Sequence, residues 1–277
     1  MSIVGAFCVV WRESRYLPLV LEQLERVPGP VLVLHADRPF FWTADTPEPS
    51  GHASAVSGIL SDWIQRLDRG FFDVTIDAPS DERLLESVPH PWTKFPSPQV
   101  LRLMGHWSTE TLLRNYATKG LREMGADVAL WQDSDFLVDL SEFDRLVETM
   151  AADEPRCWTV GARHYWRDWQ TTYSRGNFRM GYPTAATWAD GSFDRKFEET
   201  AKHADVMVHH PSYVFSDKEI HDKLSSWFHA PLAKEARWWE RWQSRDWDRD
   251  QDLQPLDVPI PAGILERLQR HGCLEGL

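Results

Sequence analysis

Two aspartates separated by one residue end an apolar run at residues 129–138, ALWQDSDFLV. A pair of carboxylates can hold one divalent cation through hard oxygen ligands and leave other positions of the ion to phosphate oxygens and water. In an extended segment, residues i and i+2 point to the same side of the chain, so we expect Asp133 and Asp135 to share an ion. The alternative is an ordinary acidic turn after a strand, and an Asp-x-Asp motif alone does not separate the two.

Further candidates for chemistry lie near other predicted strands and helices. Asp37 ends the apolar run 29–37, His209 and His210 lie in a strand-like run at 204–215, and Lys223 follows on a helix. Histidine can ligate a metal or bond a diphosphate, and lysine can neutralise a phosphate as a compact charge. A hydrogen-bonded interior histidine and a lysine on a solvated helix face are the structural alternatives, and the residue types leave both open.

The bulk composition limits the class of function. A formal net charge of −12 argues against a broad nucleic-acid surface, although it allows a local basic pocket. The three cysteines are far apart, which favours neither a disulfide framework nor a zinc site and fits a reducing, cytoplasmic compartment. The N-terminal apolar run lacks a basic flank and is short, so we expect a first strand there rather than a signal peptide or membrane span.

The elements that must position these residues alternate between strands and helices. We predict strands at 3–11, 29–37, 71–77 and 126–136. We predict helices at 15–27 and at 109–124, the second with Leu121 and Met124 in its buried stripe and ended by Gly125. Short strand–helix–strand spacing implies a parallel sheet, so the predicted fold is α/β, with a Rossmann-type, mostly parallel sheet flanked by helices. In such sheets ligands bind off the carboxyl ends of the strands, where Asp37, Asp133 and Asp135 lie.

Three segments in this order resemble glycosyltransferases of the GT-A fold, in particular the family 2 group. VVWRESRYLPLVLEQL at 9–24 is similar to the opening strand and helix of that family, with Arg12-Glu13 where Asn-Glu is usual. VLVLHAD places Asp37 where the family offers an acid to the base and ribose of the sugar nucleotide. RNYATKGLREMGADVALWQDSD at 114–135 resembles the run that delivers a metal-binding Asp-x-Asp. The likeness covers roughly residues 3–138, and HHPSYVFSDKEIHDKLSSWFH at 209–229 is similar to a later stretch of related transferases.

The resemblance implies a metal-dependent glycosyltransferase that uses Mn²⁺ or Mg²⁺ and moves a sugar from a nucleoside diphosphate, a UDP-sugar being favoured, to a hydroxyl acceptor. The implied nucleotide-sugar residues are Val10, Trp11, Arg12, Glu13, Asp37, Arg114, Asn115, Asp133, Ser134 and Lys223. The implied metal ligands are Asp133, Asp135, His209 and His210. The candidates for a catalytic base are Asp190, Asp194, Glu198 and Glu199, for which a plain amphipathic helix face is the alternative. Inverting and retaining mechanisms both stay open.

Past residue 138 the patterning is looser. Helices are predicted at 141–151, 234–247 and 257–272, strands at 156–166 and 204–215, and Ser216 and Glu219 form a capping box that opens a further helix. No linker divides the chain, so we predict one GT-A-like domain over 1–277. It comprises a nucleotide-sugar half at 1–138, a smaller acceptor-side region at 139–230 and a helical tail at 231–277.

Two other classes of protein compete with the transferase. A nucleotidyltransferase of the same fold also needs a divalent metal, but it usually has a glycine-rich loop after the first strand, which VVWRESRYLP lacks. A lectin-like module on a degenerate scaffold would bind glycans without metal or nucleotide. The chain has 15 tryptophans, and its Trp- and Arg-rich segments at 158–188 and 227–247 can stack a sugar or a nucleobase. A modified DNA base is therefore an alternative acceptor beside a small molecule, a glycan or a protein side chain.

Overall fold

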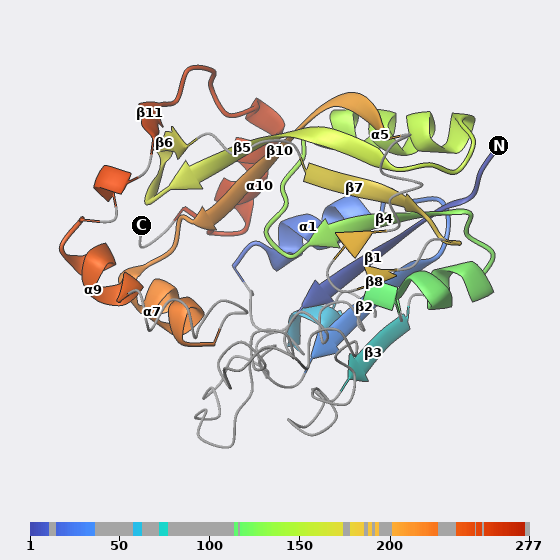
Figure 1. Ribbon diagram of the computed structural model, residues 1–277, viewed down its shortest axis with the longest axis horizontal. Coiled ribbons are helices and arrows are strands. Elements are labelled where there is room, and N and C mark those ends of the chain that lie inside the picture. The colour runs from blue at the N-terminus through green and yellow to red at the C-terminus, as the bar shows by residue number, and fades with distance from the viewer. Residues whose placement is uncertain are drawn as a thin grey trace, which may run out of the picture.

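The computed structural model describes residues 1–10, 15–36, 58–62, 72–76, 114–115, 117–173, 178–185, 188–189, 192–193, 201–226, 237–246, 248–250 and 252–274. Within them a nine-stranded sheet crosses the molecule in the order β11-β6-β5-β7-β4-β1-β2-β3, with β10 paired to β5 (Figure 1). The small pair β8 (Trp188–Ala189) and β9 (Ser192–Phe193) forms a second sheet. The predicted α/β class with a helix-flanked sheet is confirmed.

The strands of the main sheet fall into two groups. The first group is β1 (Val4–Val10), β2 (Val31–Ala36), β3 (Phe72–Ile76) and β4 (Val128–Asp133), which pair in parallel. The second is β5 (Trp158–Trp166), β6 (Asp168–Tyr173), β7 (Phe178–Pro183), β10 (Lys202–Tyr213) and β11 (Leu253–Pro255). In the second group only the β10–β5 pair is parallel, so the sheet contains more antiparallel pairing than the sequence predicts.

The described helices are α1 (Leu17–Leu24), α5 (Leu140–Ala152), α7 (Asp217–Ser226), α9 (Trp238–Gln243) and α10 (Ala262–Arg270), with the 3₁₀ turn η2 (Asp248–Asp250) and helical segments at 58–62 and 117–123. Gly125, at φ 92°, ends the segment 117–123 as predicted. Met124 was expected in the buried stripe of this segment, but its side chain is exposed, because it falls beyond the last helical turn. No described helix combines the length and the apolar character needed to cross a membrane.

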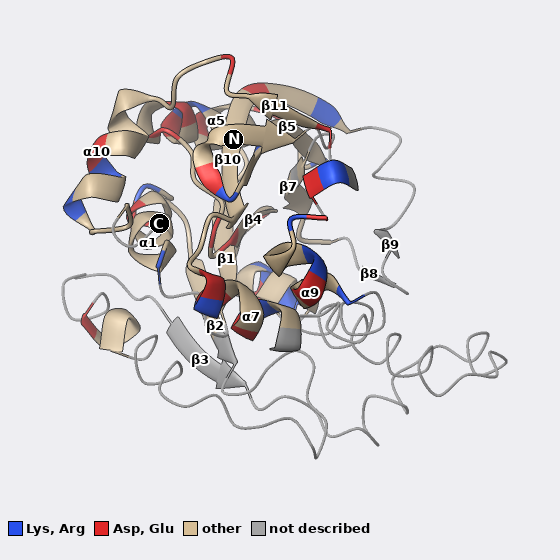
Figure 2. Cartoon of the chain, turned by 90° about the vertical axis from the view of Figure 1, so that its left-hand side faces the viewer, with Lys and Arg blue, Asp and Glu red and all other residues tan. Residues whose placement is uncertain are grey.

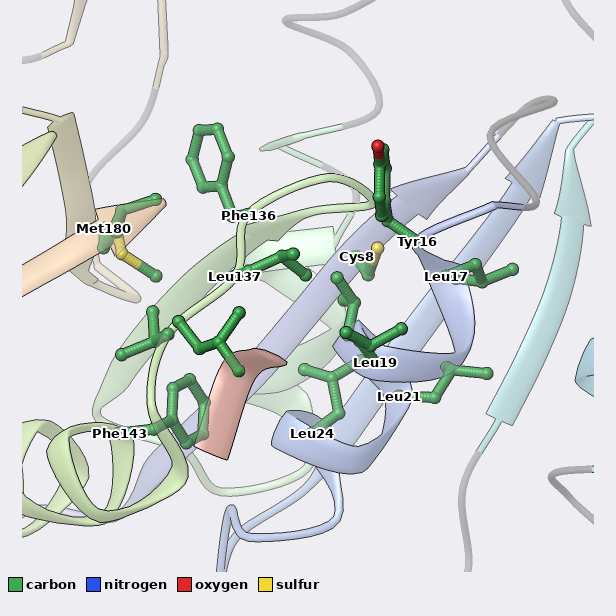
Figure 3. Close-up of a cluster of buried hydrophobic side chains, with 14 of the residues drawn as sticks. Cys8, Tyr16, Leu17, Leu19, Leu21, Leu24, Phe136, Leu137, Phe143 and Met180 are labelled. Carbon is green, nitrogen blue, oxygen red and sulfur yellow. The ribbon is translucent and has the colours of Figure 1, made fainter. Parts of the chain in front are cut away.

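Both faces of β1 are covered. Cys8 and Val10 of β1 face a cluster that includes the leucines of α1, and Phe7 faces a second cluster with Ala117 and Leu121. Figure 3 shows Cys8 in one cluster with Leu17, Leu19 and Leu24 of α1 and with Phe136 and Leu137 from the loop after β4. A strand buried on both faces reads as a continuous apolar run, which is why β1 was predictable from its sequence.

The loop after β4 is fixed by buried polar contacts. Gln23 of α1 donates from Nε2 to the carbonyl oxygen of Phe136 (3.0 Å) and accepts at Oε1 from the amide of Val138 (2.8 Å). Gln132, one residue before the end of β4, also donates from its side-chain Nε2 to the Phe136 carbonyl oxygen. Both glutamines are fully buried, so they satisfy backbone groups that water cannot reach.

Arg267 brings the C-terminal helix into the same network. It is 2% exposed and donates to the Val138 carbonyl oxygen (3.0 Å), to the Leu19 carbonyl oxygen and to Glu22 Oε2 (2.9 Å). In Figure 2, α10 and α1 accordingly lie on the same side of the sheet. Burying the guanidinium among apolar residues would be unfavourable unless nearly all its donors were paired, and here they bond to acceptors on two segments, α1 and the loop after β4.

Removing this guanidinium should therefore destabilise the whole fold. We expect Arg267→Met to lower the free energy of unfolding by about 3–5 kcal/mol, because it leaves Glu22 and two carbonyl oxygens without their buried donor. The matched control is Arg270→Met, since Arg270 contacts the same Glu22 (3.1 Å) but is 60% exposed, and such pairs contribute about 0–1 kcal/mol. Urea denaturation of both variants measures the difference. Equal losses would show that the buried contacts of Arg267 contribute nothing beyond a surface ion pair.

Candidate active site

The carboxyl ends of β1 and β4 mark the place where the order of the sheet reverses. From β1 the chain adds β2 and then β3 on one side, and it returns to add β4 on the other side of β1. Val9 of β1 pairs with Asp133, the last residue of β4. In α/β sheets a crevice opens outside the carboxyl ends of the strands at such a reversal, and ligands bind there.

Asp133 ends β4, and Asp135 lies in the turn that follows it. The amide of Phe136 donates to the carbonyl oxygen of Asp133 (3.1 Å), which closes a turn immediately after the strand. The extended geometry expected for Asp133-Ser134-Asp135 therefore ends at Asp133. Asp133 stands half-buried at the strand end, whereas Ser134 and Asp135 are buried, with Asp135 6% exposed.

Asp135 is paired with two nitrogen groups from the second half of the chain. Its Oδ2 lies 3.3 Å from Nε2 of His210 on β10 and 3.7 Å from Nζ of Lys223 on α7. Burial by itself would raise the pKa of Asp135, but the charge and hydrogen bond of His210, together with the charge of Lys223, hold this pKa well below its ordinary value. Asp135 is thus a buried carboxylate that stays ionised.

The imidazole of His210 is held in one orientation. Its Nδ1 lies 2.9 Å from Nδ1 of His164, its partner on the neighbouring strand β5, so one ring donates and the other accepts. Phe136 and Phe178 meet the same ring edge-on, with centroids 5.1 and 5.2 Å away. These contacts leave Nε2 directed at Asp135.

His209 lies on the opposite face of β10. Adjacent residues of a strand point to opposite faces, and Nδ1 of His209 accordingly contacts the hydroxyl of Tyr165 (2.6 Å) rather than Asp135. Burial, reinforced by the positive charge of Arg163, lowers the pKa of His209 to about 4, so this ring is neutral at physiological pH. Of the two predicted histidines, the structure brings only His210 to the Asp-x-Asp turn.

Lys223 does not lie on a solvated helix face. The side chain is buried, and its ammonium donates to the carbonyl oxygen (3.0 Å) and hydroxyl (2.7 Å) of Ser212. The predicted capping box is present ahead of it, because Ser216 donates to Glu219 from its amide (2.9 Å) and its hydroxyl (2.6 Å). Arg15, just before α1, pairs with the same Glu219 (2.8 Å), which ties α7 to the N-terminal half.

The other described candidates sit around β4 and β1. The guanidinium of Arg114 stacks over the ring of Trp131, with its carbon 3.7 Å from the ring centroid. Trp131 lies two residues before Asp133, so the two side chains are on the same side of β4. Trp131 was missed by the sequence analysis, although its alternation with Asp133 could have indicated it. Asn115 is half-buried next to Arg114. Val10 is fully buried against the α1 side, so it offers a ligand only its backbone.

The remaining predicted site residues lie outside the described residues. They are Trp11, Arg12, Glu13, Asp37, Asp190, Asp194, Glu198 and Glu199. Their assigned roles in nucleotide binding and base catalysis stay predictions.

Among the described residues, two adjacent side chains could hold a metal ion together, but they do not form a complete cage. No group of three or more His, Cys, Asp and Glu side chains in this part of the chain could hold a metal ion, so the four predicted ligands are not preassembled. Asp135 Oδ2 and His210 Nε2 nevertheless face each other at 3.3 Å, as two ligands of one ion do. Mg²⁺ is commonly held by one or two carboxylates, with substrate phosphates and water completing the shell. The carboxylate of Asp135 fits an ion of that kind, and Nε2 of His210 offers a nitrogen ligand beside it.

Comparisons with known proteins give similarities of fold at low sequence identity. No protein-family model matches the sequence, and no curated protein matches it. Among solved structures, S. aureus TarS 1-349 in complex with UDP-GlcNAc is similar with a TM-score of 0.42 and 10% identity, over 84% of this chain and 67% of that one. Glucosyl-3-phosphoglycerate synthase from Mycobacterium tuberculosis, in complex with Mn²⁺, UDP and phosphoglyceric acid, gives a TM-score of 0.27 and 13% identity, over 59% and 43%.

A third similar structure is CMP:2-keto-3-deoxy-manno-octonic acid synthetase complexed with CTP, with a TM-score of 0.33 and 10% identity over 74% of this chain and 90% of that one. The chain spans 66% of TarS 1-349 in its ligand-free structure and 38% of the longer TarS chain. With TM-scores of 0.27 to 0.42, these similarities decide neither the family of the chain nor its reaction, and the reaction has to be argued from the site.

The buried neutral His209 should make stability depend on pH. Its pKa is about 4 in the folded protein against about 6.5 when unfolded, so between these values the unfolded state binds the extra proton. Folding stability should therefore fall as the pH drops from 6.5 to 4, by about 1.4 kcal/mol per pH unit from this group. Urea unfolding of the natural protein and His209→Gln over this range measures the effect. The variant should show a shallower slope, and parallel slopes would contradict a neutral buried His209.

Proposed function

We propose that the protein is a nucleotide-sugar-dependent glycosyltransferase that binds its donor, with a divalent cation, at the carboxyl edge of β1 and β4. The observation that carries this proposal is the ionised, buried Asp135 beside His210 at the reversal of the sheet order. A buried carboxylate whose pKa is held low by specific partners, at an edge where α/β folds bind ligands, is typical of a functional site.

The residues of the chain divide the work of donor binding. Asp135 and His210 would hold the cation, and Asp133, half-buried at the end of β4, would add a carboxylate. A divalent cation, when bound there, supplies charge neutralisation for the leaving diphosphate. Arg114, kept flat against Trp131 on the same side of β4, offers a fixed positive charge to the nucleotide.

The acceptor hydroxyl needs a base in an inverting reaction. We keep Asp190, Asp194, Glu198 and Glu199 as the candidates for this role, and a UDP-sugar as the favoured donor with Mn²⁺ or Mg²⁺. The hydroxyl acceptor is proposed only by class.

Donor binding can be tested by thermal stability. The melting temperature should rise with UDP and Mn²⁺ together, by about 5–10 °C at a hundredfold excess over Kd, and hardly at all with either one alone. Asp135→Asn should abolish this rise. The control is Asp139→Asn, because Asp139 caps α5 through Ser141 (3.0 Å) and Asn caps a helix about as well. The control variant should keep the full rise.

The same panel separates the competing classes. A metal-dependent rise with nucleoside triphosphates and none with diphosphates would replace the proposal by a nucleotidyltransferase. A rise with free glycans that neither metal nor nucleotide affects would indicate a lectin-like module. No response of the natural protein to any nucleoside diphosphate would refute the proposed donor site.

A further inference from the structure

We propose that Lys223 is an internal counter-cation of Asp135, which keeps the site from taking up a divalent metal until a donor diphosphate arrives. The proposal rests on the proposed function, since it assumes that metal and diphosphate share this edge of the sheet. It assigns to Lys223 a role distinct from simple phosphate contact, namely control of the order in which the two ligands bind.

The ammonium of Lys223 is built into the site. Lys223 is 6% exposed, and its Nζ lies 3.7 Å from Asp135 Oδ2, the same oxygen that faces His210. Two bonds to Ser212 hold the ammonium from the other side (3.0 and 2.7 Å). The rings of Tyr213 and Phe215 lie 5.7 and 5.4 Å from Nζ. Lysine is almost never fully buried unless its charge is paired, so these contacts are what hold the ammonium inside the protein.

The backbone around Lys223 keeps it there. Ser212 falls where the ladder between β10 and β5 shifts register, between His210 and Tyr213, so its carbonyl oxygen is turned out of the ladder toward α7. Lys223 is one helical turn after Glu219, which Arg15 and Ser216 clamp. Ile220 and Leu224 on the same helix are buried in the core. The helix that carries the ammonium is therefore anchored on both sides of it.

The charges then set the order of binding. With Lys223 present, the negative charge of Asp135 is already neutralised, and a divalent cation beside it would meet a fixed like charge in a site with little water. A diphosphate brings negative charge that both the metal and Lys223 can share. Metal and donor should therefore bind together, and the free protein should hold metal weakly.

Mn²⁺ binding to the protein without nucleotide tests this directly, with free Mn²⁺ measured by electron paramagnetic resonance. Lys223→Met should bind Mn²⁺ about ten- to a hundredfold more tightly than the natural protein, because the like charge is gone. UDP should increase the Mn²⁺ affinity of the natural protein strongly and that of the variant much less. Lys223→Arg, which keeps the charge, should behave as the natural protein does.

Two further variants make the outcome decisive. Lys218→Met is the matched control, because Lys218 lies on the same helix but is 80% exposed and pairs with Asp222 (3.3 Å), and it should leave Mn²⁺ binding unchanged. Lys223→Gln, which can still bond Ser212, replaces Lys223→Met if the methionine variant does not fold. If the natural protein shows UDP-dependent Mn²⁺ binding, but Lys223→Met and Lys223→Gln bind Mn²⁺ without UDP as weakly as the natural protein does, only the proposed role of Lys223 is overturned. If the natural protein shows no UDP-dependent Mn²⁺ binding at all, the proposed function is overturned instead.

Discussion

The site depends on how the loop after β4 is held. Its backbone leaves the sheet into the buried interior, and two glutamines and Arg267 supply the hydrogen bonds that the sheet no longer provides. The loop then pairs with β10, where Leu137 and His209 exchange backbone hydrogen bonds (2.9 and 2.7 Å). Because the loop is bonded to α1, α10 and β10 at once, Asp135 enters the site at a fixed position relative to His210 and Lys223.

Residues from both halves of the chain form this one site. The N-terminal parallel strands supply the edge and the carboxylates, as a doubly wound sheet does. The side chains that pair with Asp135, His210 and Lys223, come from β10 and α7, more than 70 residues later. The antiparallel strands matter for the same reason, because β5 and β7 carry His164 and Phe178, which orient the ring of His210.

The parts of the fold that the sequence predicted are those governed by local rules. Buried runs such as 3–11, the glycine at 125 and the Ser216–Glu219 capping box each follow from residues near one another in the chain. Strands β6 and β7 were missed, because their aromatic and polar residues show no period of two. Strand alternation could have separated His209 from His210. Arg267 also carried a signal, since it falls between Ile264 and Leu268 on the apolar face of α10. The burial of Lys223 could not be foreseen, because it depends on a register shift in β10.

A buried cluster of Asp135, His210 and Lys223 is not what stability alone would favour. Desolvating charges is unfavourable enough that well-packed apolar residues in their place are often neutral or stabilising. Most buried positions in the described core hold leucine, valine and aromatic rings, and Arg267 is a buried charge with a structural role. A buried carboxylate with Lys223 and His210 beside it, at the edge where the sheet order reverses, favours a ligand that uses this cluster. A lectin-like scaffold that no longer bound metal or diphosphate would have no use for a buried, ionised carboxylate beside Lys223 and His210. The cluster thus favours the transferase over the lectin-like module.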